Sequence, residues 1–180
     1  IKGSLGPLEF IKNFGGVASF FKTGHTNGTK FVRDNEADVA GEISGHYFFG
    51  DNHACDDAIY NSCRMLEIVS KKGKLSALAD KIPEYCSTTE LRLDYPDGKK
   101  NALIEDLKKK VDKIFFEVIT LDGVRLQTKD SWGIARVSNT APMVTFRFEG
   151  RTKKKLEEIY NTFQDLLGDE LKLPPLKEVT

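Results

Sequence analysis

The sequence predicts an α/β segment followed by an α+β segment. Helical and β-prone patterns alternate up to Cys86, an order typical of a partly parallel sheet, whereas one strand, one helix and then successive short strands follow it. The 180 residues, 39% of them apolar, suffice for one large or two small cores. We therefore predict an incomplete three-layer αβα mixed-sheet domain at 1–86, a βαβββα domain with helices on one face of an antiparallel sheet at 87–168, and a C-terminal tail at 169–180.

We expect the first segment to begin inside a domain, because Ile1 is followed almost at once by an amphipathic stretch at 5–14. Gly15-Gly16 ends that stretch, and the apolar run 17–21 predicts a buried strand. The further elements expected up to Cys86 are a short helix within 26–36, two strands within 39–49, a helix from Asp56 or Asp57 to Gly73, and one or two helical turns over 75–82. We interpret the Asp56 and Asp57 carboxylates as helix caps and not as paired acids. The long helix has an apolar stripe at Ile59, Cys63, Leu66 and Val69.

The second segment follows a different pattern. Residues 87–95 predict a strand, and Leu103, Leu107 and Val111 form the stripe of a helix over 101–111. The elements expected beyond it are a β-rich stretch at 114–121, an Asp122-Gly123 turn, strands at 124–127, 132–136 and 143–149, and a final helix at 152–167 capped by Gly168. The aromatic core residues predicted here are Phe115, Phe146, Phe148 and Phe163.

Charge and cysteine content exclude several classes of protein. The 27 basic and 27 acidic side chains leave no net charge, whereas binding to a polyphosphate scaffold or an anionic membrane surface needs an excess of one sign. No apolar run approaches the roughly 18 residues of a transmembrane helix. The three cysteines are odd in number and never spaced as Cys-x-x-Cys, so we expect reduced thiols, a cytoplasmic protein and no metal site in this chain.

A glycine-bracketed loop carries the first candidate binding groups. The run Gly41-Glu42-Ile43-Ser44-Gly45-His46 places a carboxylate, a hydroxyl and an imidazole close together, and its glycines let a ligand approach the backbone. A carboxylate accepts hydrogen bonds from two adjacent hydroxyl groups, while serine and histidine donate or accept, which suits a sugar. A tight β-turn with solvated Glu42 and His46 is the alternative interpretation, and the loop alone leaves both open.

A second candidate loop lies between two predicted strands. The run Arg136-Val137-Ser138-Asn139-Thr140-Ala141-Pro142 concentrates a guanidinium, two hydroxyls and a side-chain amide. A phosphate dianion is bound by such a set, through charge-assisted bonds from arginine and small donors around the other oxygens. A polar hairpin turn with Arg136 in a surface ion pair is the alternative interpretation.

Four motifs occur in order along the chain, and together they resemble a known family. They are Lys22-Thr23-Gly24-His25, GEISGHYFF from Gly41, the Asp56-Asp57 helix start and RVSNTAP from Arg136. This set is similar to the α-D-phosphohexomutases, most closely their phosphomannomutase/phosphoglucomutase branch. The resemblance implies most of the family's third domain and its entire fourth domain. Nothing in the sequence matches the family's catalytic serine loop or its aspartate-rich magnesium loop, which belong to its first and second domains.

The resemblance also implies roles for individual residues. In the third domain, Glu42 and Ser44 would bind sugar hydroxyls, and His46 would act as a catalytic, proton-handling or hydrogen-bonding group. Lys2 and His25 resemble further substrate-binding residues of the family. In the fourth domain, the residues that would anchor the non-reacting phosphate are Arg136, Ser138, Asn139 and Thr140. Asn139 is typical of the phosphomannomutase/phosphoglucomutase branch.

The function implied is that of a phosphohexomutase acting on mannose or glucose phosphates. It would interconvert hexose 1-phosphate and hexose 6-phosphate through an enzyme phosphoserine and a hexose 1,6-bisphosphate intermediate. Mg²⁺ would be bound by the missing second domain, so this chain would depend on the missing N-terminal domains and be inactive alone. We expect Glu42 and Arg136 to face a shared cleft about one hexose apart.

Two other classes of function are alternatives to the mutase. A non-catalytic phosphosugar-binding module or regulator would share Glu42 and Arg136, and this stretch of sequence does not separate it from the enzyme. A nucleic-acid-binding βαβββα domain is disfavoured by the zero net charge and by the lack of an exposed aromatic and basic strand pattern. We therefore expect a phosphorylated hexose as partner, with no nucleic acid and no membrane.

Overall fold

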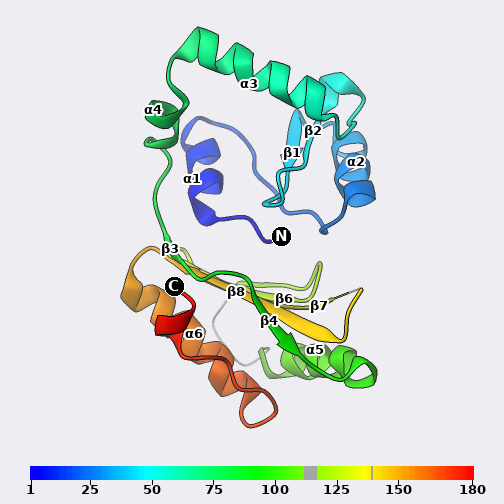
Figure 1. Cartoon of the computed structure of the whole chain (residues 1–180), viewed down its shortest axis with the longest axis vertical. Helices are drawn as coiled ribbons and strands as arrows, with labels where there is room; N and C mark the ends of the chain where they lie inside the picture. The colour runs from blue at the N-terminus through cyan, green and yellow to red at the C-terminus, as the bar shows by residue number, and fades with distance from the viewer. Residues whose placement is uncertain (112–116, 139) are drawn as a thin grey trace. The chain divides into compact units, whose positions relative to one another are not determined.

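The computed structural model describes residues 1–111, 117–138 and 140–180 (Figure 1). It divides into two compact units, Ile1–Pro83 and Glu84–Thr180. The division falls three residues before the boundary that the sequence predicts, because Cys86 already belongs to a strand of the second unit. Each unit has its own core and is described by itself.

The first unit is built from four helices and one β-hairpin. Its helices are α1 (Leu5–Asn13), α2 (His25–Asp34), α3 (Ala58–Lys72) and α4 (Leu75–Ala79), with a 3₁₀ turn at Gly50–Asn52. Strands β1 (Val39–Gly41) and β2 (Tyr47–Phe49) pair antiparallel. The small core is made by Phe21, Val32, Ala40, Phe48 and Ala54. Helix α2 packs so closely on the hairpin that a Cβ at Gly28 would lie 2.4 Å from the Phe48 ring.

The long helix α3 starts where its sequence predicts. The Asp57 Oδ1 atom accepts hydrogen bonds from the N–H groups of Ile59 and Tyr60 at 2.9 and 3.1 Å, which satisfies two donors of the first turn. Gly73, with φ of 90°, ends the helix. The apolar stripe is not covered, however: Ile59 is 79% exposed and Leu66 69% exposed.

The predicted mixed sheet of the first unit is not formed. Residues 17–21 make no strand, Val17 is 94% exposed, and the sheet within Ile1–Pro83 is the two-stranded antiparallel hairpin. A strand needs a neighbour for its backbone donors and acceptors, and here β1 and β2 use each other. The apolar pattern of 17–21 therefore places only Phe21 in the core.

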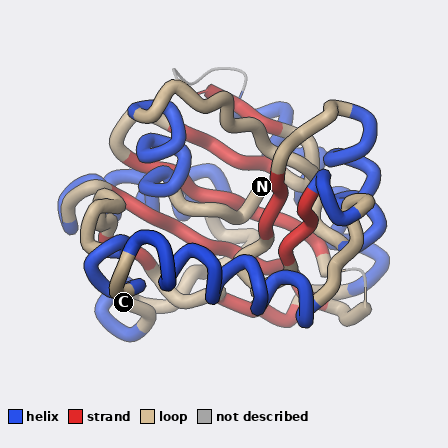
Figure 2. The backbone as a smooth tube through the Cα atoms, turned by 90° about the horizontal axis from the view of Figure 1, so that it is seen from above, coloured by secondary structure: helices blue, strands red, loops and turns tan. Residues whose placement is uncertain are grey.

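The second unit is an antiparallel sheet with two helices on one face (Figure 1). Figure 2 shows its strands, in red, running side by side. The strand order is β3-β8-β7-β6-β5, and β4 also pairs with β8. The strands are β3 (Cys86–Ser87), β4 (Leu91–Asp94), β5 (Glu117–Ile119), β6 (Val124–Gln127), β7 (Ser131–Val137) and β8 (Met143–Gly150), and the helices are α5 (Asp97–Val111) and α6 (Lys153–Leu167). This confirms the predicted antiparallel sheet and the single helical face.

The βαβββα formula lacks one strand. A second strand is missing from it too, because the single strand predicted at 87–95 is formed as β3 and β4. Among the described residues, four strands, β5 to β8, separate the two helices, because the β-rich stretch contributes Glu117–Ile119. Phe115 lies outside the described residues. The Asp122-Gly123 turn between β5 and β6 is formed as predicted: Gly123 has φ of 95°, and a Cβ there would lie 2.2 Å from the Ala135 carbonyl oxygen. Glycine is required at this position by both conformation and space.

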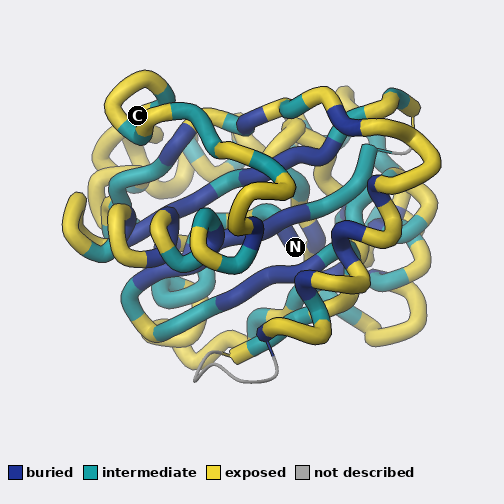
Figure 3. Tube along the Cα trace, turned by 90° about the horizontal axis from the view of Figure 1, so that it is seen from below, coloured by how far each residue is buried: buried dark blue, intermediate teal, exposed yellow. Residues whose placement is uncertain are grey.

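Alternation along the strands gives the sheet two different faces. Val144, Phe146 and Phe148 of β8 pack on the helices, together with Leu107 of α5 and Phe163 of α6, and these residues are buried. Long buried stretches, in dark blue, run through the centre of the molecule in Figure 3. The opposite face is polar, and on it the Arg125 guanidinium lies 3.9 Å over the Trp132 ring. The indole Nε1 of Trp132 donates to Glu149 at 2.9 Å. Burial lowers the pKa of Arg125 to about 9, against the opposing effects of the Glu149 and Glu117 carboxylates.

The segment after α6 is attached to this unit by apolar and polar contacts. Leu171, Leu173, Leu176 and Val179 pack against the core, and the N–H of Thr89 donates to the Val179 carbonyl at 2.8 Å. The Tyr95 hydroxyl donates to the Glu170 carboxylate, and this bond raises the pKa of Tyr95 to about 12. The C-terminal segment is therefore held to the start of α5 by a bond that needs a neutral tyrosine.

We predict that this bond stabilises the second unit below about pH 10 and not above about pH 12. The folded state keeps the Tyr95 proton up to a pKa of about 12, whereas the ordinary value is 10.0, so the contribution is complete below the lower value and is lost as the pH rises through the higher one. The free energy of unfolding in urea should differ between the unmodified protein and Tyr95→Phe near pH 9, and the difference should shrink near pH 11. Burial also raises the pKa of Tyr160 to about 12. Because Tyr160 is present in both proteins, its contribution cancels in the difference between their free energies of unfolding. A difference that stays constant with pH would contradict the prediction.

Candidate functional site

The first loop is a tight turn that closes the hairpin between β1 and β2. The Glu42 N–H donates to the His46 carbonyl at 2.9 Å, the Gly45 N–H donates to the Glu42 carbonyl at 3.0 Å, and Gly45 has φ of 87°. The turn interpretation of the backbone is therefore confirmed. It does not account for the side chains, which make specific contacts of their own.

Glu42 connects two of the sequence motifs. Its Oε1 accepts a hydrogen bond from the Gly24 N–H at 2.7 Å, and its Oε2 accepts one from the Ser44 hydroxyl at 3.1 Å. Gly24 is the N-cap residue of α2, where a negative charge is favoured by the helix dipole. The carboxylate is thus held by a backbone group of the Lys-Thr-Gly-His loop, and each oxygen keeps a lone pair for a further donor.

His46 is oriented by a carboxylate that the sequence assigns to a helix cap. Its Nδ1 lies 2.5 Å from Asp56 Oδ2, and the Asp56 side chain is only 16% exposed. Because a carboxylate accepts only, a neutral His46 carries its proton on Nδ1 and leaves Nε2 as an acceptor. Asp57 alone caps α3, so the cap interpretation is correct for Asp57 and wrong for Asp56.

The remaining predicted residues of the first unit lie next to these groups along the chain. His25 follows Gly24, is exposed, and its ring lies 5.7 Å from that of Phe48. The backbone nitrogen of Ile1 donates to the Phe21 carbonyl at 3.1 Å, which brings the residue before Lys2 beside the residue before Lys22. Lys2 itself is half-buried. The loop at 22–25, the loop at 41–46 and Lys2 therefore belong to the same region of the first unit.

The second loop projects from the polar face of the sheet. Ala135 and Val137 of β7 face the helices, so Arg136 and Ser138 face the other way. The N–H groups of Thr140 and Ala141 point at the Ser138 hydroxyl oxygen at 3.3 and 3.1 Å, which shapes the turn. Asn139 lies outside the described residues, so its predicted role stays a prediction.

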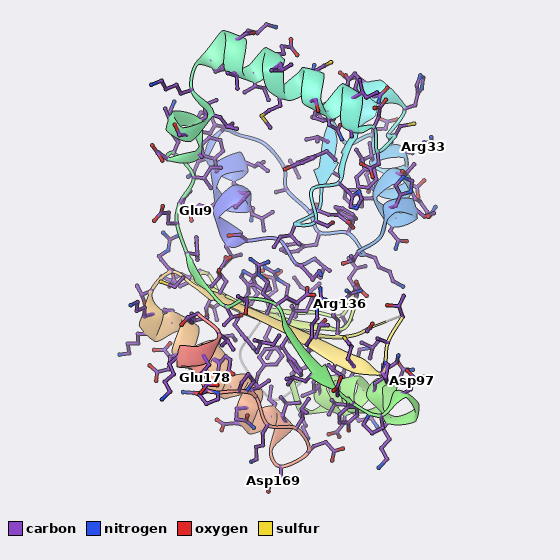
Figure 4. All side chains as sticks on the ribbon, viewed as in Figure 1. Glu9, Arg33, Asp97, Arg136, Asp169 and Glu178 are labelled. Carbon is purple, nitrogen blue, oxygen red and sulfur yellow. The ribbon has the colours of Figure 1, made fainter. Side chains whose placement is uncertain are left out.

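Arg136 is paired but is not on the surface. Its Nη2 lies 3.1 Å from Asp122 Oδ2, and the two side chains are 14% and 13% exposed. Arg136 is labelled in Figure 4. The Arg136 Nε is buried and has no hydrogen-bond partner among the described residues. The surface ion pair of the alternative interpretation is therefore wrong, and the guanidinium retains a donor that the described part of the protein does not use.

Three residues near the candidate groups are missed by sequence reasoning. Asp56 orients His46, Asp122 pairs with Arg136, and Lys100 of α5 donates to the carbonyl oxygens of Ser138 and Ala141. The Asp122-Gly123 sequence predicts a tight turn, but it does not predict that Asp122 pairs with Arg136. Lys100 resembles any other lysine of a helix in water, because the fold alone brings it to a loop 38 residues away.

Comparisons with known proteins agree with the two-part architecture. The family model for phosphoglucomutase/phosphomannomutase, alpha/beta/alpha domain III, matches residues 2–85, and that for the C-terminal domain of the same family matches residues 90–166. The chain belongs to the phosphoglucomutase/phosphomannomutase family. The family resemblance of the sequence motifs is thereby confirmed, together with the assignment of the two units to its third and fourth domains.

Individual relatives support the same conclusion. The chain is 38% identical over 161 residues to a phosphoglucomutase of Neisseria gonorrhoeae and 36% identical over 162 residues to a phosphomannomutase/phosphoglucomutase of Pseudomonas aeruginosa. These alignments cover 88% and 89% of the chain but 35% of each relative. A crystal structure of a family member from Burkholderia thailandensis matches with a TM-score of 0.77 and 37% identity, over 88% of this chain and 34% of that one. The chain therefore spans about a third of the length of these enzymes.

Two further properties concern the described residues. No three His, Cys, Asp or Glu side chains among them are grouped so that they could hold a metal ion, so the Mg²⁺ that the family implies finds no ligand set there. No helix in the same part of the chain has the length and apolar character of a membrane span. The shared cleft that the sequence predicts between Glu42 and Arg136 remains a prediction.

We predict that Asp56 fixes the tautomer of His46. In the unmodified protein, ¹⁵N NMR of the imidazole in the neutral state should show the proton on Nδ1, because Asp56 Oδ2 accepts from that atom. Asp56→Asn should move a substantial share of the proton to Nε2. Asp57→Asn makes the same change of charge one residue away and keeps the N-cap function, so it should leave the tautomer unchanged. Identical spectra for Asp56→Asn and the unmodified protein would show that the pair does not orient His46.

Proposed function

We propose that the protein carrying this chain is a phosphohexomutase that interconverts hexose 1-phosphate and hexose 6-phosphate of mannose or glucose. This chain supplies sugar-hydroxyl binding from the first unit and phosphate binding from the second. The observation that carries the proposal is the Glu42 carboxylate, which the Gly24 N–H and the Ser44 hydroxyl hold in the loop that carries the family motif. Solvated residues of a simple turn would not need both contacts.

The groups of the first unit suit adjacent sugar hydroxyls. Glu42 accepts from two neighbouring O–H groups through the lone pairs that Gly24 and Ser44 leave open. Ser44 either donates to a sugar oxygen or accepts from a sugar hydroxyl. His46, held at Nδ1 by Asp56, presents Nε2 as the atom that accepts or returns a proton.

The groups of the second unit suit a phosphate that does not react. Arg136 supplies the charge, and the hydroxyls of Ser138 and Thr140 supply further donors. We assign Asn139 to the same set from its position in the motif. Asp122 offsets part of the charge of Arg136, so the phosphate is bound without an excess of positive charge. That balance suits a reaction in which the sugar must bind in two orientations and then leave.

The phosphoryl donor is proposed to lie outside this chain. A phosphoserine gives its phosphoryl group to the sugar, hexose 1,6-bisphosphate forms, and the other phosphate returns to the serine. Mg²⁺ supplies charge stabilisation to that transfer when it is bound elsewhere in the protein. The chain alone should therefore bind and orient substrate without turning it over, whereas a phosphosugar-binding regulator would show no turnover even at full length.

We predict that Arg136→Ala in the full-length protein weakens the binding of hexose 6-phosphate by about 2 kcal/mol, or roughly thirtyfold, because charge-assisted bonds to the phosphate are lost. Isothermal titration with glucose 6-phosphate measures the change. Arg92→Ala is the matched control, since Arg92 belongs to the same sheet, is exposed and pairs with the nearby Glu90. Unchanged affinity in Arg136→Ala, or an equal loss in both variants, would show that the loop is a hairpin turn without a role in phosphate binding.

We predict that Glu42→Gln weakens the binding of hexose phosphates while sparing inorganic phosphate. The amide keeps the shape of the side chain but loses one acceptor oxygen and the charge, so bonds from sugar hydroxyls are weakened while the phosphate loop is untouched. Titration with glucose 6-phosphate and with inorganic phosphate gives the two affinities. Glu67→Gln, on α3, changes charge equally and should alter neither. Equal loss of both ligands in Glu42→Gln would place the sugar elsewhere.

A further inference from the structure

Lys100 is a buried lysine whose ammonium is directed at the candidate phosphate loop. It lies in the first turn of α5, and its side chain is 11% exposed. Its Nζ donates to the Ser138 carbonyl at 2.7 Å and to the Ala141 carbonyl at 3.2 Å, and it lies 2.6 Å from Asp97 Oδ1. An ammonium has three donors, so these three acceptors use all of them.

The two carbonyls mark the two ends of the loop between β7 and β8. Ser138 directly follows β7, and Ala141 lies two residues before β8. Lys100 therefore joins both ends to α5, while the Ser138 hydroxyl accepts from the N–H groups of Thr140 and Ala141 inside the turn. The residues that carry the two candidate hydroxyls, Ser138 and Thr140, thus lie in the segment whose ends Lys100 holds.

The direction of the carbonyls matters for an anion. A carbonyl oxygen is the negative end of the peptide dipole and would repel a phosphate oxygen. Lys100 holds two such oxygens towards α5, where its charge stabilises them. A side chain without donors would leave two loop carbonyls and Asp97 without this partner, and the loop would be free to expose its acceptors.

The charge of Lys100 acts locally. Asp97, at the start of α5, neutralises much of the field that the ammonium would otherwise exert at a distance (Figure 4). Lys100 is therefore different from Arg136, whose Nε has no partner among the described residues. Its effect on a ligand is expected to pass through the geometry of the loop.

We propose that Lys100 is a positioning residue for phosphate binding, which holds the loop between β7 and β8 with its carbonyls turned away from the anion and its hydroxyls fixed. This inference rests on the proposed function of that loop. It adds a residue of α5 to a site for which the sequence motif supplies residues 136–140 only.

Lys100→Met in the full-length protein is the test, because methionine fills a similar volume without hydrogen-bond donors. Lys99→Met is the matched control, since Lys99 is the exposed neighbour on the same helix. Affinity for inorganic phosphate and for glucose 6-phosphate should fall roughly tenfold in Lys100→Met, as expected for the loss of one or two good hydrogen bonds from the ligand, and should not change in Lys99→Met. Without ligand, the amide NMR shifts of Ser138, Thr140 and Ala141 should change only in Lys100→Met.

The outcomes separate this inference from the proposed function. If Arg136→Ala loses phosphate affinity and a folded Lys100→Met does not, the inference is wrong and the proposed function stands. If Arg136→Ala keeps its affinity, the loop is not the phosphate site and both proposals fail. Lower thermal stability in Lys100→Met with unchanged phosphate affinity would show a purely structural lysine.

A second variant keeps the test decisive if Lys100→Met does not fold. Lys100→Arg keeps the charge, but a planar guanidinium does not reproduce the three directions of an ammonium. It should bind phosphate several-fold more weakly than the unmodified protein, and more tightly than Lys100→Met where that variant can be measured. Unmodified affinity in Lys100→Arg, together with altered loop amide shifts, would overturn the inference.

Discussion

The pairing of β7 with β8 is the constraint that positions Arg136 and the second candidate loop. Seven residue pairs, from Ser131 opposite Gly150 to Val137 opposite Val144, fix the register of the two longest strands. Because side chains alternate, this register sends Ala135 to the helices and Arg136 to the polar face. A slip of one residue would place the guanidinium among the core aromatics and the core side chains in the polar layer. The register is secured from the apolar side, where a Cβ at Gly133 would lie 2.7 Å from both Phe148 and Phe163. The core therefore determines where the charged loop begins.

The first unit also holds its candidate side chains at defined positions, but with far less regular structure. Its sheet is one hairpin of three residue pairs, and its core has five buried side chains. The side chains of Glu42 and His46 are instead positioned by single polar contacts between the motifs: Gly24 to Glu42, Ser44 to Glu42 and His46 to Asp56. Phe48 stabilises this arrangement from the core. It is fully buried, packs against Gly28 of α2, and its ring contacts that of His25. A hairpin so short is specified less by its ladder than by the residues at its ends.

Local patterns in the sequence predict the local structure well. The N-cap at Asp57, the Asp122-Gly123 turn and the strand at Val124–Gln127 follow from short-range rules about caps, turns and alternation. The misplaced strand at 17–21 shows the limit, because apolar character does not supply a hydrogen-bonding neighbour. The same limit applies to the site. Both candidate loops are visible as clusters of polar residues in sequence, whereas Asp56, Asp122 and Lys100 act on partners 10, 14 and 38 residues away. Their roles depend on tertiary contacts, which the spacing of residues along the sequence does not predict.

Neutral composition and anion binding are compatible because the cations of the second loop are individually balanced. Arg136 is paired with Asp122, and Lys100 with Asp97, so the region has positive groups at fixed positions without a strong field around them. A site built from an excess of charge would attract any polyanion and retain it, since long-range attraction does not distinguish a sugar phosphate from a nucleic acid. A site built from balanced pairs gains affinity only at hydrogen-bonding distance, where direction and shape decide which ligand fits. The zero net charge of the chain is therefore consistent with the proposed phosphate site, whose selectivity would depend on the loop geometry that we assign to Lys100 and to the β7–β8 register.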